Sequence, residues 1–162
     1  MSTYIVKKVD YCSAEQVATL MDLLQMYAID PMGGAEAIEN EVLEKLPQKL
    51  KSKPFMHSFI VYDEDEALGF ANCIESFSTF SASSILNVHD FAVNTQHRGK
   101  GIGLMLMAGI ESFAREHGYK KLTLEVLSGN TPAIKAYKKA GFSPYQLNPE
   151  LGDAQFWQKS LS

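Results

Sequence analysis

The sequence predicts an α/β domain, and three observations lead to this expectation. Segments with the two-residue alternation of a β-strand are interspersed with segments of helical periodicity. The chain has 162 residues, a length that suits one hydrophobic core, and no linker, repeat or low-complexity stretch interrupts it. Hydrophobic residues make up 46% and charged residues 21%, as in an ordinary globular protein. We therefore expect a single domain over residues 1–162.

The first half should begin with a strand followed by two helices. Residues 4–9 alternate like a strand, and Ser13 with Gln16 resembles a capping box that opens a helix. Residues 30–34 contain a proline and two glycines, which end this helix. A second helix is expected over residues 35–46, where a following proline disturbs its end.

The remaining elements follow from the same two periodicities. Strands are expected over residues 55–62, 67–77, 84–93 and 122–127, near Tyr145 and over 154–159. One helix should follow a glycine-rich run and end at Gly118, and another should cover residues 133–140. The expected order is therefore β-α-α-β-β-β-α-β-α-β-β.

The glycine-rich run lies between an apolar strand and an amphipathic helix, over residues 95–104. Its glycines allow backbone conformations with positive φ and a close approach of a ligand. The first turn of the following helix presents unpaired N–H groups and the positive end of the helix dipole. The run therefore predicts a site for a phosphate or pyrophosphate group.

Two well-known phosphate-binding motifs do not fit this run. In a Walker A loop the Gly-Lys pair at 99–100 would be followed by Ser or Thr, but Gly101 follows it, and Asn94 occupies the place of the upstream glycine. A dinucleotide-binding fingerprint needs a small residue at position 104 or 106, and both positions hold leucine, Leu104 and Leu106.

A third pattern fits. Arg98-x-x-Gly101-x-Gly103 resembles the R/Q-x-x-G-x-G/A pyrophosphate loop of the GNAT superfamily, the acetyl-CoA-dependent N-acetyltransferases. If this pattern is considered alone, the alternative to a pyrophosphate loop is an ordinary strand-to-helix turn whose glycines allow close packing.

A second motif lies further along the chain. Thr131 is a candidate N-cap with Pro132 at the first helical position, and Gly141 is a candidate helix stop. Ala133 and Tyr137 lie four residues apart on one helical face. The order Asn130, Ala133, Tyr137, Gly141-Phe142 resembles the second GNAT signature, N-x-x-A-x-x-x-Y-x-x-x-G-F.

Two motifs in the order of one family, about one strand and one helix apart, are more specific than either alone. The resemblance covers nearly the whole chain and is strongest over residues 85–142. It implies a GNAT-like mixed twisted central sheet with helices on both faces.

The resemblance also implies how acetyl-CoA is bound. In the family the strand before the glycine loop parts from its neighbour and offers backbone groups to the pantetheine arm, which satisfies groups that would be costly to bury unpaired. For Lys100 two roles stay open: binding of the phosphates, or a position at the surface without contact with the cofactor. The implied cofactor-binding residues are Phe91, Ala92, Val93, Arg98, Gly99, Lys100, Gly101, Ile102, Gly103, Leu104, Asn130, Ala133 and Tyr137.

Direct attack of an amine on the thioester needs no enzyme nucleophile and no metal. Tyr137 matches the family's usual proton donor to the leaving thiolate, and a phenol is protonated at neutral pH. The general base is either His89, whose imidazole titrates near neutral pH, or Glu125 acting through water. Related enzymes often have a carboxylate at the place of His89, so a purely structural role for His89 stays open. Alternation puts His89 on the face of Phe91 and Val93, and Asp90 on the opposite face.

For the acceptor, the loops resemble those of diamine and polyamine acetyltransferases. A small primary amine or a polyamine is favoured over a peptide or protein amine, and the formal net charge of −4 gives a cation no long-range penalty. The alternative is a noncatalytic acyl-CoA-binding or sensing module, against which the combination of Tyr137 with an intact glycine loop argues. The acceptor-binding residues we expect are Asp30, Met32, Glu36, Glu75 and Thr79.

Composition argues against several other classes. The acidic balance disfavours nonspecific binding to nucleic acid, and no apolar run approaches membrane-spanning length. Cys12 and Cys73 lie far apart, and the four histidines form no metal-ligand spacing. The first residues do not resemble a signal sequence, so we expect a cytoplasmic protein without a structural metal. A homodimer stays open.

Overall fold

The computed structural model describes residues 3–162. The chain divides into two compact units, an N-terminal unit that ends at Leu124 and a C-terminal unit from Glu125 to Ser162. Each unit is described by itself, and the single domain over 1–162 stays a prediction.

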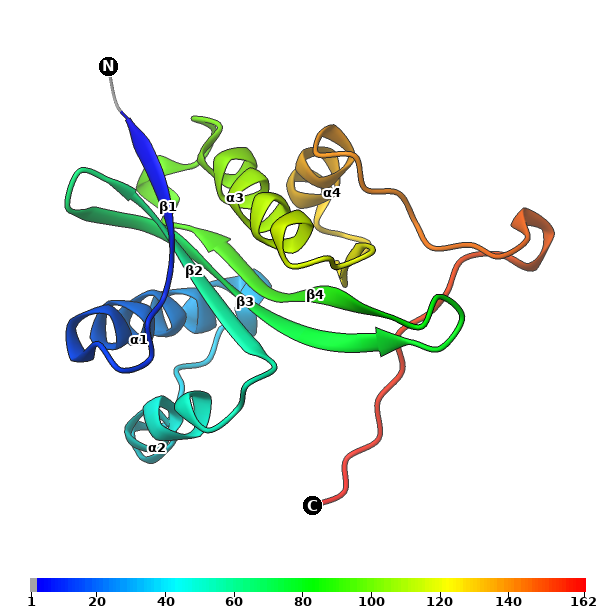
Figure 1. Ribbon diagram of the computed structural model, residues 1–162. Coiled ribbons are helices and arrows are strands. Elements are labelled where there is room, and N and C mark those ends of the chain that lie inside the picture. The colour runs from blue at the N-terminus through cyan, green and yellow to red at the C-terminus, as the bar shows by residue number, and fades with distance from the viewer. Residues whose placement is uncertain (1–2) are drawn as a thin grey trace. The chain divides into compact units, whose positions relative to one another are not determined.

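The N-terminal unit is built on a five-stranded sheet with the strands in chain order (Figure 1). The first three pairings are antiparallel and the last is parallel, so the sheet is mixed as expected. Its strands are β1 (Tyr4–Lys8), β2 (Met56–Asp63), β3 (Glu66–Ser78), β4 (Ser83–Val93) and β5 (Leu122–Leu124).

Three helices cover the two faces of this sheet. Helices α1 (Ala14–Ile29) and α2 (Asn40–Lys51) lie on one face, and α3 (Ile102–Glu116) lies on the other (Figure 1). None of the helices in the described part of the chain is long and apolar enough to cross a membrane. The prediction of a mixed sheet with helices on both faces is confirmed.

The face toward α1 and α2 has an apolar core formed by helix and strand residues. Leu20 and Leu24 of α1 pack in one cluster with Ile60, Phe70 and Ala92 from three adjacent strands. The predicted capping arrangement opens α1: the Ser13 hydroxyl accepts a hydrogen bond from the N–H of Gln16 at 3.3 Å. This start places the apolar stripe of α1 against the sheet.

On the other face, a glycine lets α3 approach the edge strand β1. A Cβ at Gly109 would lie 2.6 Å from Cγ1 of Val6, which is closer than real Cβ contacts come. Leu106 and Ile110 on the same helix are completely buried. The middle of α3 is therefore packed closely against the sheet.

The second helix differs from the prediction. We expected it over 35–46, but α2 runs from Asn40 to Lys51 and includes Pro47. The side-chain amide of Gln25 donates to the carbonyl of Ile38 at 3.0 Å and accepts from its N–H at 2.7 Å. This contact between distant residues occupies both backbone groups of Ile38, so the helix begins after it.

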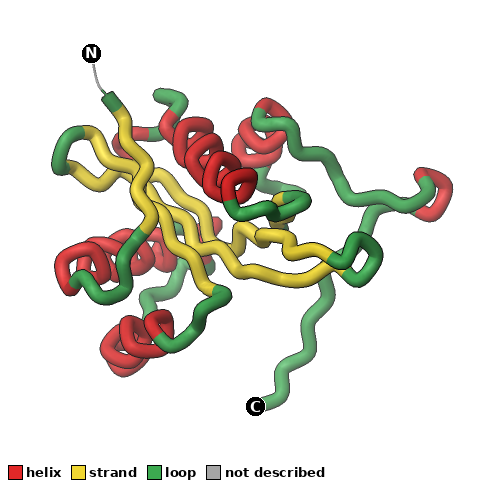
Figure 2. Tube along the Cα trace, viewed as in Figure 1, coloured by secondary structure: helices red, strands yellow, loops and turns green. Residues whose placement is uncertain are grey.

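The C-terminal unit contains the helix α4 (Thr131–Lys139) and a short 3₁₀ turn at Pro149–Leu151. Asn130, rather than Thr131, is the N-cap, because its side chain accepts from the N–H of Ala133 at 3.3 Å. The expected strands near Tyr145 and over 154–159 are wrong: this part of the chain is loop (Figure 2). The N–H of Ala154 donates to the carbonyl of Tyr145 at 3.0 Å, but neither segment belongs to a sheet in the described part of the chain. β5 likewise ends at Leu124 instead of 127.

Candidate functional site

The turn between β4 and α3 has the backbone that the glycine pattern predicts. Asn94 caps a 3₁₀ turn at Thr95–His97, and two glycines with positive φ follow, Gly99 at 78° and Gly101 at 80°. A Cβ at either glycine would meet nothing within 4 Å, so the backbone conformation, and not crowding, requires glycine there. Within this unit, the space beside both glycines is open.

Helix α3 begins without a side-chain cap. Its N-cap is Gly101, which has no side chain to accept from the first amides, and the N–H of Met105 bonds to the carbonyl of Gly101 at 3.2 Å. The amides of Ile102, Gly103 and Leu104 come before it, in the first turn, where helix geometry offers no carbonyl partner. These amides and the helix dipole together favour an anion, so the residues present fit a pyrophosphate group.

Gly103 has a different role from Gly101. A Cβ at Gly103 would lie 3.7 Å from Phe91 Cε1 and 3.8 Å from Val93 Cγ2, which is ordinary van der Waals contact. The first turn of α3 therefore rests on the β4 residues that were predicted to border the pantetheine arm. An alanine fits there, in agreement with the G/A position of the family pattern.

Arg98 joins two predicted regions of the site. Its Nε donates to the carbonyl of Val93 at 3.0 Å, and its guanidinium donates to Oδ2 of Asp30, also at 3.0 Å. Asp30 further accepts from the N–H of Met32, and this bond, followed by the bond from Arg98, holds the pKa of Asp30 below its ordinary range. The roles of Arg98 in phosphate binding and of Asp30 in acceptor binding stay predictions, and Lys100 is exposed.

β4 parts from its neighbour where the resemblance places the pantetheine arm. Its parallel pairing with β5 covers only the three residues from Leu86 to Val88, because β5 ends at Leu124. From Asp90 to Val93, β4 is paired with β3 alone within the sheet. This stretch leads directly into the glycine turn.

A β-bulge opens that stretch. Asn72 of β3 pairs with Asp90, whereas the next residue, Cys73, pairs with Val88, so His89 is the extra residue. The bulge interrupts the alternation from which the face of His89 was predicted. Asp90 nevertheless lies on the side opposite Phe91, since it faces α1 and α2 with Asn72. Bulges occur preferentially next to active sites, where they reorient side chains.

The imidazole of His89 is exposed and makes no hydrogen bond or ion pair with any other residue that the structure describes. It is therefore accessible, as a general base must be. Its role stays a prediction.

The sequence analysis missed a buried chain of polar side chains on the α1 and α2 face. Tyr11 and Ser58 are joined through their hydroxyls at 2.7 Å, Ser58 donates to Asn72 Oδ1 at 2.6 Å, and Asn72 donates to Asp90 Oδ2 at 3.0 Å. Ser58 is completely buried and Asn72 is 4% exposed. The only sequence signals were Asn72 within the apolar run 67–74 and Ser58 directly before the apolar run 59–61.

Tyr27 lies close to this chain and to Asp30. Burial raises the pKa of its phenol first, and the negative charges of Asp90 and Asp30 raise it further. Both carboxylates therefore lie near the Tyr27 phenol at the end of α1, where Asp30 is paired with the guanidinium of Arg98.

Glu75, a predicted acceptor-binding residue, belongs to a second cluster on the α3 face. Tyr119 donates to its Oε2 at 2.6 Å and Ser84 donates to its Oε1 at 3.0 Å, so both carboxylate oxygens are engaged. These bonds, that of Tyr119 first, lower the pKa of Glu75. The structure does not bring Glu75 together with Asp30.

His57 completes this second cluster. Its Nε2 lies 3.3 Å from the Tyr119 hydroxyl, which already donates to Glu75, so Nε2 carries the proton in this arrangement. Its Nδ1 is buried without a hydrogen-bond partner. Burial lowers the pKa of His57, followed in effect by the charge of Lys8.

The other predicted acceptor residues lie at the surface of the N-terminal unit. Met32 is 46% exposed in the turn after α1, and Glu36 is exposed shortly after it. Thr79 is exposed in the turn between β3 and β4. Their roles stay predictions.

In the C-terminal unit, α4 carries the second motif. Asn130 caps the helix, and Ala133 and Tyr137 are half-buried, one turn apart. The Tyr137 ring lies 6.1 Å from that of Phe142, whose N–H donates to the Tyr137 carbonyl. Glu125 is exposed at the start of this unit.

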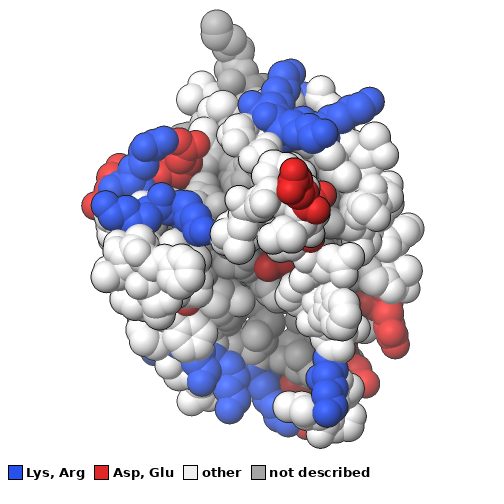
Figure 3. Space-filling model, turned by 90° about the vertical axis from the view of Figure 1, so that its right-hand side faces the viewer, with Lys and Arg blue, Asp and Glu red and all other residues white. Residues whose placement is uncertain are grey.

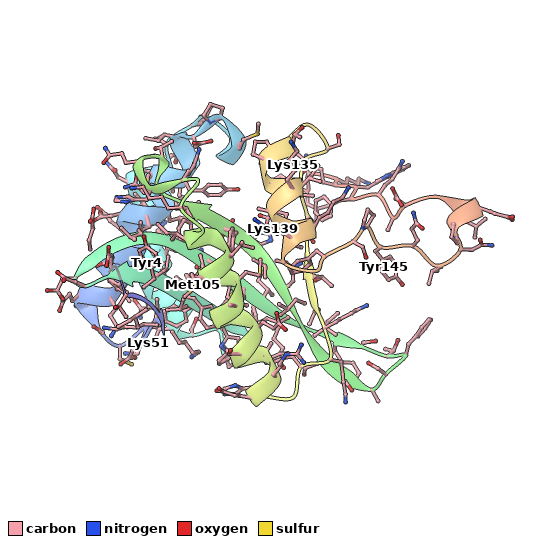
Figure 4. The ribbon with its side chains drawn as sticks, turned by 90° about the horizontal axis from the view of Figure 1, so that it is seen from above. Tyr4, Lys51, Met105, Lys135, Lys139 and Tyr145 are labelled. Atoms are coloured by element: carbon pink, nitrogen blue, oxygen red, sulfur yellow. The ribbon has the colours of Figure 1, made fainter. Side chains whose placement is uncertain are left out.

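Charges on the molecule are mixed in sign. On the face in Figure 3, lysine and arginine side chains form small groups separated by uncharged surface. Lys135 and Lys139 lie on successive turns of α4 (Figure 4). Among the described residues, no group of three or more His, Cys, Asp or Glu side chains is arranged to hold a metal ion.

A mixed sheet with a glycine-rich turn between a parted strand and α3 defines an α/β protein whose turn is suited to an anionic group such as a phosphate. Comparison with known families narrows this class. Residues 19–142 match the model of the acetyltransferase (GNAT) family, and the chain belongs to that family.

Two characterised relatives are similar over part of the chain. Streptothricin acetyltransferase of Streptomyces lavendulae is 42% identical over 80 residues, which cover 48% of this chain and 42% of the relative. Mycothiol acetyltransferase of Corynebacterium glutamicum is 30% identical over 101 residues, which cover 61% of this chain and 33% of the relative. The chain thus spans less than half the length of these relatives.

Solved structures share the fold over nearly the full length. An integron cassette protein from the mobile metagenome of V. cholerae is 26% identical, with a TM-score of 0.78 and coverage of 99% of this chain and 93% of its own. An aminoglycoside acetyltransferase from an uncultured soil metagenomic sample, in complex with sisomicin, is 14% identical, with a TM-score of 0.80 and coverage of 98% and 97%.

Proposed function

We propose that this chain transfers the acetyl group of acetyl-CoA to a primary amine of a small molecule. The observation that carries the proposal is the uncapped, glycine-led start of α3 directly after a strand whose pairing with β5 stops at Val88. The turn suits the pyrophosphate, and the parted strand suits the peptide-like arm of the same cofactor.

Acetyl-CoA supplies a reactive acetyl thioester when it is bound. The amides of Ile102, Gly103 and Leu104 hold the pyrophosphate, and the backbone of β4 orients the arm. His89, or Glu125 through a water molecule, removes a proton from the acceptor ammonium, and the neutral amine attacks the thioester carbonyl. Tyr137 then donates its phenolic proton to the leaving thiolate.

A covalent enzyme intermediate is unnecessary in this scheme. Burial raises the pKa of Cys73 to about 12, so its thiol stays protonated at neutral pH and is a poor nucleophile. Both cysteines are unpaired, which supports the cytoplasmic location that we propose.

For the acceptor we propose a cationic small amine, with a diamine or polyamine ahead of peptide and protein amines. Asp30 and Asp90 both act on the phenol of Tyr27, and the net charge of −4 favours a cation. The name of one relative adds streptothricin to the compounds worth testing.

The test is release of free thiol from acetyl-CoA with a panel of monoamines, diamines, streptothricin and peptides. Turnover with at least one small amine supports the proposal, and binding of acetyl-CoA without turnover on any compound supports the noncatalytic module. Transfer to peptides alone would contradict the proposed acceptor class.

Tyr137→Phe tests the proposed acid, because it keeps the ring and removes the proton. We expect kcat to fall by roughly 10²–10⁴-fold, while the affinity for acetyl-CoA changes little. Single-turnover measurements isolate the chemical step, and unchanged rates there would exclude this phenol as the proton donor.

A further inference from the structure

We propose that Asp90 binds the acceptor ammonium and that the buried chain of Tyr11, Ser58 and Asn72 positions its carboxylate for that contact. The proposal rests on the proposed function, which assigns no role to any of these four residues. Asp90 touches the substrate, whereas Asn72, Ser58 and Tyr11 act through it.

The hydrogen bonds of the chain have a fixed direction. Ser58 has one hydroxyl proton and uses it toward the Asn72 carbonyl oxygen, so the contact with Tyr11 is donated by the phenol. Asn72 then has only its NH₂ group for Asp90. The reversed amide would place an oxygen against the carboxylate, so the chain determines the orientation of Asn72 and, through it, that of Asp90.

The location of the chain argues that it has a purpose beyond packing. Ser58 and Asn72 lie among Ile60, Phe70 and Ala92 on the apolar face. Apolar residues there would avoid the cost of burying polar groups. A fully satisfied polar chain is worth retaining where it fixes one arrangement of a polar group at its end.

The end of the chain has an unused acceptor. Oδ2 of Asp90 accepts from Asn72, and no hydrogen bond reaches Oδ1. Among the described residues, the only buried side-chain polar atom without a partner is Nδ1 of His57, so Oδ1 of Asp90 is open to solvent. A carboxylate with one oxygen anchored and one open is suited to bind an ammonium group.

The position of Asp90 suits this task. It follows the bulged His89 and begins the part of β4 that has no partner in β5. It also lies near Tyr27 at the end of α1, where the carboxylate of Asp30 is already paired with the guanidinium of Arg98 at 3.0 Å. An acceptor held there on the α1 side would approach the parted strand from the face opposite α3.

The first experiment is calorimetric titration of a diamine into the protein saturated with coenzyme A, a measurement that needs no turnover. Asp90→Asn keeps the shape and removes the charge, and we expect the Kd of the diamine to rise at least tenfold. Asn72→Leu should produce a similar rise, with the Kd of acetyl-CoA within about twofold of the parent value. The matched control is Tyr119→Phe, which breaks the cluster on the opposite face and should leave the diamine Kd unchanged.

A double-mutant cycle separates positioning from a general loss of structure. If Asn72 acts through Asp90, Asn72→Leu should have little further effect on diamine affinity once Asp90→Asn is present. Additive effects, or an unchanged Kd in a folded Asp90→Asn variant, would overturn the proposal. Tyr11→Phe, a milder change at the far end of the chain, should give a smaller rise in the same direction.

The outcome is independent of catalysis. Diamine binding that depends on Asp90 and Asn72, without thiol release, would contradict the proposed function and leave the positioning chain supported. Turnover of an amine with unchanged kinetics in Asp90→Asn would support the proposed function and contradict the positioning proposal. A parent protein that binds no amine would overturn the positioning proposal.

Discussion

The two faces of the sheet each contain a polar cluster, and the clusters differ in where their unused atoms lie. On the α1 and α2 face, the chain from Tyr11 ends at Asp90, which has an oxygen open to solvent. On the α3 face, both oxygens of Glu75 are engaged, and the unused atom is the buried Nδ1 of His57. The first cluster presents a charge outward, while the second holds its charge within the fold.

This difference separates two carboxylates that looked alike in the sequence. The sequence predicts that Glu75 binds the acceptor, and it places Asp90 on the face opposite Phe91 without a predicted role. In the structure Asp90 lies on the sheet face that α1 and α2 cover. It is near the end of α1, where Asp30 also lies. A cationic acceptor is therefore expected on the α1 face, and substitutions in the two clusters should affect different properties.

The largest effect on stability should come from Ser58→Ala. It leaves Asn72 Oδ1 and the Tyr11 hydroxyl without their partner in a buried position. An orphaned buried polar group costs about 1–3 kcal/mol of unfolding free energy, and urea denaturation would measure the loss. The same variant should also bind a diamine more weakly. If its stability falls but its diamine affinity is normal, the chain that ends at Asp90 has only a structural role, like the cluster around Glu75.

Tyr119→Phe should cost less, about 1–2 kcal/mol, because, of the two hydrogen bonds that it removes, one goes to a partly exposed carboxylate and the other, from His57, is 3.3 Å long. KM for the amine and kcat should stay within about twofold of the parent values, in steady-state assays beside Ser58→Ala. A large rise in KM would return Glu75 to the acceptor site and remove the distinction between the faces.

The smallest effect is a pH dependence between neutral and mildly acidic pH, which comes from the α3 face. Because the pKa of His57 is lowered in the folded state, the unfolded chain binds more protons, and stability falls as the pH drops below the ordinary histidine value of 6.5. Glu75, whose pKa is also lowered, adds a second loss below its ordinary value of 4.5.

His57→Gln should remove the upper part of this pH dependence. Unfolding free energies from urea titrations at pH 7.5, 6.0 and 5.0 would show it, with the parent protein losing stability over this range and the variant losing less. Equal slopes for the two proteins would mean that the buried imidazole does not control acid stability.

Local patterns predicted the elements that depend on local interactions. The cap at Ser13 and the positive φ of Gly99 and Gly101 follow from the chemistry of single residues and their neighbours. Distant contacts decided the rest. The start of α2 depends on Gln25, and the absent C-terminal strands depend on a partner that the sequence does not specify.

The acceptor side of the site was hard to predict for the same reason. The polar chain draws single residues from four segments, and the bulge at His89 shifts the register of β4 by one residue. Neither the polar chain nor the bulge produces a recognisable motif in the sequence. In the C-terminal unit, Phe156 and Trp157 are 75% and 82% exposed, and the homodimer stays a prediction.

The central claim is that the start of α3 binds the pyrophosphate of acetyl-CoA, and calorimetry with two aspartate variants tests it most directly. Gly101→Asp and Gly118→Asp add the same charge at positive φ, 80° and 75°, with nothing within 4 Å of either Cβ, at opposite ends of one helix. They should therefore carry similar strain. We expect Gly101→Asp to weaken acetyl-CoA binding at least a hundredfold, since a carboxylate would lie where the phosphates bind, and Gly118→Asp to bind like the parent protein. Equal affinities in two folded variants would contradict the account.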